Sequence, residues 1–153
     1  MRMVEQISRM LAGICAHRNA GRDLEAAHEI DVHCRQTIGL PLELVRRSSP
    51  EALWELLQQS GGLSYPRAIM LAELLLHDAE LSKTATRTAD ATLSQLHAYC
   101  LLAESISVLS SDDVAIYGPR LEALAIELES LSRDPYVQQK LHAYRTKQRS
   151  AAG

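Results

Sequence analysis

The sequence has no phenylalanine and only six aromatic residues, five tyrosines and one tryptophan, in 153 positions. It is also poor in the residues that interrupt regular structure, with seven glycines and five prolines. Because aromatic residues are enriched in strands, their scarcity argues against a β-sandwich. Hydrophobic residues make up 46% of the chain, which argues against disorder. This composition is typical of an all-α protein whose core is built from aliphatic side chains.

An excess of positive charge is missing as well, since the formal net charge is −3. Without a basic field to attract phosphate groups, we expect no nucleic-acid partner. The most apolar run, AIMLAELLL from Ala68 to Leu76, is interrupted by Glu73 and is far too short to cross a bilayer. The first residues, MRMVEQISRM, carry Glu5 where a signal peptide needs an apolar core. We therefore expect a cytoplasmic protein with no membrane partner.

Cysteine is scarce, with Cys15, Cys34 and Cys100 as the three examples. An odd number leaves one thiol unpaired under any bridging, and no pair forms a C-x-x-C motif. In a cytoplasmic chain the expected state of such cysteines is a buried free thiol.

The first forty residues predict a helical hairpin. One helix is expected over about residues 3–19, ended by Gly21, and a second is capped by Asp23 and ends at Gly39 and Pro41. Because the link is so short, the two helices must lie antiparallel. The apolar residues at helical spacing are Val4, Ile7, Leu11 and Ile14 in the first helix, and Leu24, Ala27, Ile30, Cys34 and Ile38 in the second.

The middle of the chain predicts a short turn over LPLELVRR and then two helices. SSPEALWELLQQSGG combines a serine cap, Pro50 at the first helical position and a stop at Gly61–Gly62. The next helix, over 66–81, has apolar residues on every side of its axis, which places it at the centre of the molecule. Residues 83–90, KTATRTAD, predict a loop or a frayed helix end.

The remainder predicts three further helices, for a total of seven or eight and no strand. A long helix over 90–109 has one apolar face, Gly118–Pro119 interrupts the chain, and Asp134–Pro135 opens a terminal helix that ends near Gln148. We expect one domain over residues 1–149 and a disordered tail over 150–153. The apolar residues are Leu93, Leu96, Cys100, Ala103 and Ile106 in the long helix, and Leu121, Leu124, Leu128 and Leu131 in a helix that begins at Pro119.

The stretch AGRDLEAAHEID resembles the second helix of a tetratricopeptide (TPR) repeat. In that pattern a glycine, here Gly21, is followed five positions later by a small residue, Ala26, and then by a large apolar one, Ile30. The small residue allows the two helices of a hairpin to approach closely. A looser copy of the pattern lies over residues 89–103, about 70 residues downstream, which is close to two repeat units.

Over residues 1–110 the chain resembles a family of uncharacterised bacterial TPR-like proteins. The resemblance implies antiparallel helical hairpins, packed as a right-handed superhelix or a bundle, and it implies no activity. The matching residues are Gly21, Arg22, Glu25 and Ala26, then Leu40, Pro41 and Leu42, then Ser48 to Leu57, Leu71 to Leu76, and Tyr99 to Leu102.

Residues that could carry chemistry occur only in incomplete patterns. A metal site needs three or more ligands, and each candidate pair lacks partners at a fixed spacing. A cysteine nucleophile needs a histidine on the same helical face, and the neighbours His17 and His33 do not meet this condition. We therefore predict no enzyme, no catalytic, cofactor-binding or metal-binding residues, and no cofactor. The candidate pairs are Glu25–His28, Glu73–His77 and His97–Cys100.

The sequence favours a non-enzymatic scaffold that binds a protein or peptide partner of unknown identity. Leu11 and Cys15 break the basic clamp by which some TPR proteins hold a peptide carboxylate. A homodimer through the C-terminal half is expected, because Ile126 lies far around the axis from the leucine stripe of its helix. The terminal helix carries several basic residues that could be a solvated cap or an anion contact. The alternative function is an enzyme or metal-binding protein whose site is assembled from distant residues.

Overall fold

A computed structural model of the chain describes residues 2–59, 64–131 and 133–152. Within these ranges it contains eight α-helices, one short 3₁₀ helix (η1) and no strand, which confirms the all-α prediction. The helices are α1 (Arg2–Asn19), α2 (Asp23–Ile38), α3 (Leu42–Arg47), α4 (Pro50–Gln59), α5 (Ser64–Thr84), α6 (Thr88–Ser105), η1 (Ile106–Val108), α7 (Ser111–Leu131) and α8 (Pro135–Ala152).

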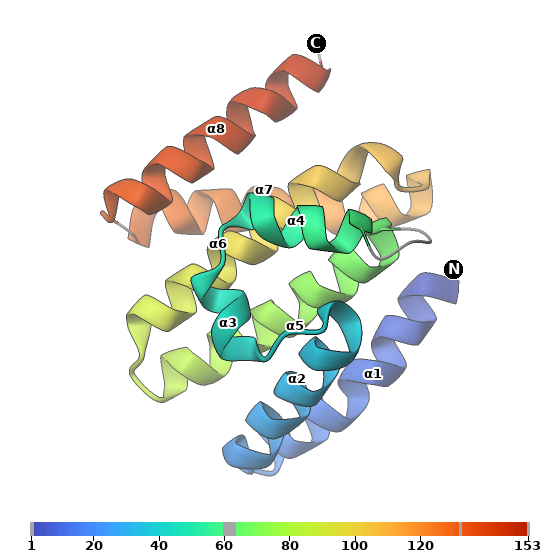
Figure 1. The fold of residues 1–153 in the computed structure, drawn as a ribbon, viewed down its shortest axis with the longest axis vertical. Helices are drawn as coiled ribbons and strands as arrows, with labels where there is room; N and C mark the ends of the chain where they lie inside the picture. Colours follow the sequence, from blue (N-terminus) through green and yellow to red (C-terminus); the bar gives the residue numbers. More distant parts are fainter. Residues whose placement is uncertain (1, 60–63, 132, 153) are drawn as a thin grey trace.

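The helices are arranged around the antiparallel pair α5–α6 (Figure 1). The hairpin α1–α2 lies at one end of the molecule and packs on α5, while α7 and α8 lie toward the other end and pack on α6. The short helices α3 and α4 cover the same central pair between these two ends. A chain with so few aromatic residues therefore builds its core by surrounding two aliphatic helices with the other six.

The central position predicted for residues 66–81 is confirmed, since six apolar side chains of α5 are completely buried. The structure adds α6, which was predicted to have one apolar face but is buried around most of its circumference. The predicted face includes the buried Leu96 and Cys100, the partly buried Leu93, and Ala103 and Ile106, which pack against the core, but burial extends well beyond this face. The reason is that α6 contacts α3, α4, α5, α7 and α8, so even its polar residues Ser94 and Gln95 are enclosed.

Two details of the first hairpin differ from the prediction. Leu24 is 86% exposed, because it lies about 200° around the helix axis from the fully buried Ala26. Asp23 does not cap α2: it is the first helical residue, and the capping position is held by Arg22 without a side-chain hydrogen bond. The buried residues of α2 are Ala26, Ile30, Cys34 and Thr37.

The segment predicted as a turn after Pro41 is the helix α3. Two backbone amides, those of Leu44 and Val45, donate to the Pro41 carbonyl, and the Leu42 amide donates to Asp31 Oδ1 at 2.8 Å. Leu42 and Val45 are buried at i,i+3 spacing, and this burial favours a helical turn over an irregular one. The cap predicted at the start of α4 is confirmed for Ser49, whose Oγ accepts from the Ala52 amide at 3.1 Å. The stop predicted at Gly61–Gly62 lies outside the described residues.

The break predicted at Gly118–Pro119 was wrong, because α7 runs through both residues from Ser111 to Leu131. Proline removes one backbone hydrogen bond and normally interrupts a helix. Here Tyr117 and Leu121 are buried on either side of it, so packing holds both halves of α7 against its neighbours. At the other helix start, the Asp134 cap is confirmed by a 2.9 Å bond from the Tyr136 amide, and α8 continues beyond Gln148 to Ala152.

The turns of the α1–α2 and α5–α6 hairpins are alike. In each, a residue with positive φ, Gly21 (73°) or Thr86 (61°), precedes an arginine, Arg22 or Arg87, with φ near −90° and ψ near 70°. The arginine amides donate to carbonyls five residues back, both at 2.8 Å. A buried alanine follows four positions after each arginine, Ala26 in one hairpin and Ala91 in the other. The two hairpins therefore share one turn geometry, at Gly21–Arg22 and at Thr86–Arg87, whereas the looser sequence copy over residues 89–103 begins only after the second turn.

We expect Ala26→Leu and Ala91→Leu each to lower the free energy of unfolding by roughly 1–3 kcal/mol. Each alanine is buried in its hairpin, so three additional carbon atoms overpack the contact. Ala12→Leu, on the exposed side of α1, is the matched control and should leave stability nearly unchanged. Urea unfolding of the three variants measures the difference, and a result in which Ala26→Leu equals the control contradicts this packing.

A buried ion pair joins α3 to the central helices. Arg46 donates from Nε and Nη2 to the two carboxylate oxygens of Asp78 on α5, at 2.9 and 2.6 Å. Ser94 Oγ on α6 donates to Asp78 Oδ2 at 2.7 Å. The exposed fractions of Arg46 and Asp78 are 8% and 1%, so both charges are withdrawn from water and depend on each other.

Candidate functional site

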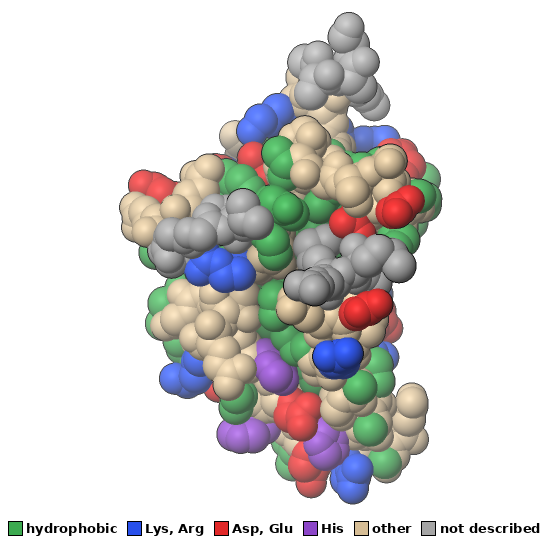
Figure 2. Space-filling model, turned by 90° about the vertical axis from the view of Figure 1, so that its right-hand side faces the viewer, with side chains coloured by type: hydrophobic (Ala, Val, Ile, Leu, Met, Phe, Trp, Pro, Cys, Tyr) green, Lys and Arg blue, Asp and Glu red, His purple; other side chains and the backbone are tan. Residues whose placement is uncertain are grey.

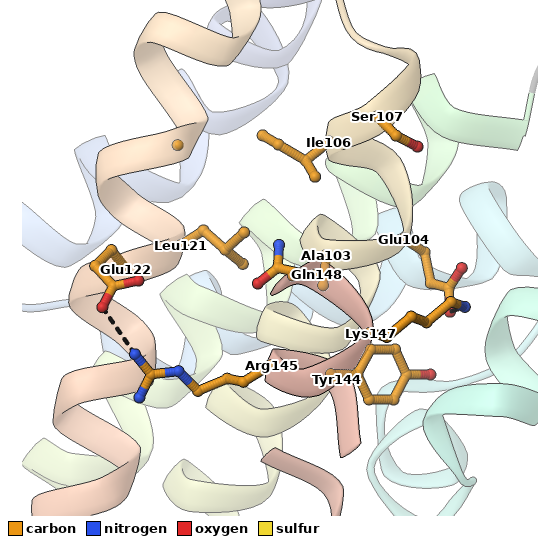
Figure 3. A pocket seen from close by; sticks show the side chains of 11 residues that line it. Ala103, Glu104, Ile106, Ser107, Leu121, Glu122, Tyr144, Arg145, Lys147 and Gln148 are labelled. Carbon is orange, nitrogen blue, oxygen red and sulfur yellow. Dashed lines mark hydrogen bonds and ion pairs between the residues drawn. The ribbon is translucent and has the colours of Figure 1, made fainter. Parts of the chain in front are cut away.

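A cleft of about 520 Å³ lies on the described part of the molecule where the end of α6, η1, α7 and α8 meet. Its floor is apolar, formed by Ala103, Ile106, Leu121 and Tyr144 (Figure 3). The size falls within the range of small-ligand pockets, and an apolar floor favours desolvation of an apolar group. The lining residues include no cysteine or histidine.

Charged pairs bound the cleft. Glu122 on α7 accepts from Arg145 Nη2 on α8 at 2.9 Å (Figure 3). Arg145 also pairs with Glu129. On another side, Lys147 Nζ lies 2.9 Å from Glu104 Oε1 on α6. Exposed pairs of this kind contribute little stability, and α8 is held by its buried Val137, Leu141 and Tyr144.

The same pairs explain the basic character of α8. Lys140 pairs with Glu51 on α4, so three described cations of this helix are matched by acids on the body of the protein. The predicted alternatives, a solvated cap or an anion contact, thus give way to intramolecular pairing at these positions.

The tyrosines near the cleft stay protonated at neutral pH. Burial raises the pKa of Tyr144, and burial raises the pKa of Tyr99 to about 12. The Tyr99 hydroxyl donates to Gln148 Oε1 at 3.1 Å. Both hydroxyls can therefore donate hydrogen bonds at neutral pH.

The outward side of α7 carries an apolar row, which we call the α7 crest: Ile116, Pro119, Ala123 and Ile126. All four side chains are exposed, Ile116 by 44% and Ile126 by 57%. At 100° per residue they occupy a sector of only about 80°. One flank of the helix lines the cleft, and the other, with Arg120 and Leu124, lines a second hollow of about 340 Å³. The crest is therefore a ridge between two depressions.

Sequence reasoning found Ile126 but missed Ile116. The predicted break at Gly118–Pro119 assigned the two isoleucines to different elements, so their common face was hidden. Reading the periodicity through the proline, at 116, 119, 123 and 126, is the signal that finds the crest. The leucine stripe behind it is confirmed for Leu121, Leu124 and Leu128, which are buried, whereas the side chain of Leu131 lies outside the described residues.

Glu25 and His28, the first candidate ligand pair, are both exposed near the turn of the α1–α2 hairpin. They border a shallow hollow with His17 and Glu29, where His17 Nε2 lies 3.4 Å from Glu29 Oε1. Figure 2 shows histidine side chains close to acidic ones at the lower end of the displayed face.

The second pair, Glu73–His77, is divided between two arginines. Glu73 is buried and pairs with Arg120 on α7, while His77 Nδ1 lies 2.8 Å from Arg18 Nη1 on α1. Burial lowers the pKa of His77, and the two guanidinium groups lower it further. His77 is therefore a neutral acceptor for Arg18, and both side chains join helices rather than a common ligand.

The third pair, His97–Cys100, is enclosed by the core. His97 lies between two carbonyl oxygens, with Nδ1 2.7 Å from that of Leu93 and Nε2 2.5 Å from that of Ser48. Burial lowers the pKa of His97 and raises that of the Cys100 thiol. None of the hollows found among the described residues gathers three of the six candidate ligands.

The three cysteines are free, and Cys34 and Cys100 are buried as predicted, whereas Cys15 is partly buried. Burial raises the pKa of Cys34 to about 12, so this thiol stays protonated and unreactive at neutral pH. Among the described residues, no group of three or more His, Cys, Asp or Glu side chains could hold a metal ion. Over the same part of the chain, every helix is too short or too polar to cross a membrane.

Comparisons with known proteins found no matching family model, no similar curated protein and no similar solved structure.

Proposed function

We propose that the protein is a non-enzymatic, TPR-like interaction module that binds another protein through the α7 crest and the cleft beside it. The observation that carries this proposal is the concentration of exposed apolar surface on one helix. Among the described residues, two of the eight large exposed hydrophobic side chains, Ile116 and Ile126, lie on the α7 crest together with the exposed Pro119 and Ala123. Contiguous apolar surface of this kind marks interaction sites in soluble proteins.

The two matched hairpin turns support the TPR-like part of the proposal. Each places a small buried residue, Ala26 or Ala91, at the same position after the turn, as a TPR second helix does. Repeats of this type bury their own hydrophobic faces by stacking and present the remaining surface to partners. The location proposed for such a module is the cytoplasm.

A site-specific photo-crosslinker tests the proposal directly. Benzoylphenylalanine replaces Ala123 in the middle of the crest, and in a matched control it replaces Ala16 on the exposed side of α1. After irradiation in cells, we expect protein adducts from position 123 and few from position 16. Equal labelling from both positions, or none from either, contradicts a docking surface on α7.

A further inference from the structure

We infer that the partner of the α7 crest is a second copy of this chain, packed with its α7 antiparallel to the first across a two-fold axis near Leu121. This inference rests on the proposed function and adds the partner and the register. The crest residues follow spacings of three, four and three positions, from 116 to 119, 123 and 126. Alternation of three and four is the seam of a two-helix coiled coil, in which each side chain enters a gap on the facing helix.

The spacing is also symmetric along the helix. Ile116 and Ile126 lie five positions on either side of Leu121, and Pro119 and Ala123 lie two positions on either side. In an antiparallel pair, Ile116 is then level with Ile126 of the partner subunit, and Pro119 is level with Ala123 of the partner subunit. The large isoleucines are therefore level with each other at the two ends of the seam, and the smaller proline and alanine are level with each other at its centre. The small residues at the centre allow the two helices to approach closely.

The charges beside the seam allow the same arrangement. A two-fold axis places the cleft flanks of the two helices side by side, so the Glu122–Arg145 pairs of both copies meet. Arg145 of one copy then adjoins Glu122 of the partner subunit, and the signs alternate around the group. On the other flank the two Arg120 side chains approach, and each is already paired with Glu73 of its own chain. A second copy provides these complementary charges because a two-fold interface brings the same surface of both subunits together.

The seam has polar ends, which set its length. The next positions in the pattern are Asp112 and Ser130, both exposed. A standard interface buries about 800 Å² on each partner, which takes many more residues than the four apolar ones of this seam. We therefore expect a reversible dimer, and its contact includes the edge of the cleft as well as the crest.

Cysteine pairing tests the register. In a Cys15→Ser background, Ile116→Cys and Ile126→Cys proteins are oxidised separately and as an equal mixture. Equivalent positions 116 and 116, or 126 and 126, are about 15 Å apart in the antiparallel seam, because ten residues rise at 1.5 Å each. We expect a disulfide dimer from the mixture at least tenfold more abundant than from either protein alone. Pairing within each separate protein indicates a parallel seam and overturns the inference, as does the absence of pairing in all three samples.

Sedimentation equilibrium of the unmodified chain provides the second measurement. We expect dimers at micromolar concentration and a monomeric mass for Ile126→Asp, with Leu24→Asp as a matched control on an exposed leucine outside the crest. A monomeric wild type overturns the self-association and leaves the docking proposal to the photo-crosslinking experiment. A dimer that survives Ile126→Asp overturns this placement of the interface.

Discussion

Replacing Arg46 by methionine is expected to lower the free energy of unfolding by about 3–5 kcal/mol. The guanidinium is the bidentate partner of Asp78, and its removal leaves a 1%-exposed carboxylate with the Ser94 hydroxyl as its remaining hydrogen-bond donor in the structure. Breaking a buried pair by removing one partner costs this much, because the other charge stays in a medium of low polarity. Urea unfolding monitored by circular dichroism measures the loss.

Arg47→Met is the matched control for this variant. Arg47 follows Arg46 in the same helix and pairs with the exposed carboxylate of Glu43 at 2.9 Å, with 73% of its own side chain exposed. We expect a loss of at most about 1 kcal/mol from this substitution. A double variant, Arg46→Met with Asp78→Leu, should recover much of the stability, because no unpaired charge remains. Equal losses from the two arginine substitutions would show that the Arg46–Asp78 pair is not buried in solution.

Leu75→Ala is expected to cost about 2–5 kcal/mol of stability. Leu75 is fully buried on α5, among side chains that surrounding helices hold in place, so its truncation leaves a cavity. Leu24→Ala removes the same atoms from the α1–α2 hairpin, where the leucine is 86% exposed, and should change stability by less than about 0.5 kcal/mol. Thermal unfolding compares the two, and a larger loss from Leu24→Ala would mean that the helical face assigned to α2 is wrong.

Leu24 and Pro119 show where prediction from sequence fails. Helical spacing alone includes Leu24 in an apolar stripe, yet the buried face of α2 is formed by Ala26, Ile30, Cys34 and Thr37. The local preference of Gly118–Pro119 is to interrupt a helix, yet buried neighbours on both sides keep α7 continuous. In both cases tertiary packing decides, and packing depends on partners that are distant in sequence.

Features with strong local causes were predictable. Gly39 ends α2 with a left-handed conformation, and Ser49 and Asp134 cap their helices. The apolar residues on every side of the helix over 66–81 correctly predicted its central position. The cleft was not predictable, because it exists only where α6, α7 and α8 meet. The α7 crest was predictable in part: Ile126 was recognised as surplus apolar surface, but its alignment with Ile116 requires one uninterrupted helix.

The matched turns of the two hairpins also bear on how fast the chain folds. In both, helices that contact along their length are separated by only three residues, so few conformations are lost before their contacts form. Proteins rich in such local contacts fold in microseconds to milliseconds. The α5–α6 hairpin contains the most buried helices of the molecule, and closing its turn brings these together in one step. The first hairpin uses glycine, Gly21, at the position of positive φ, whereas the second uses Thr86. Positive φ is unfavourable for a residue with a side chain, so the turn of the second hairpin is strained at Thr86. Replacing Thr86 by glycine would therefore be expected to accelerate refolding if this turn forms in the transition state.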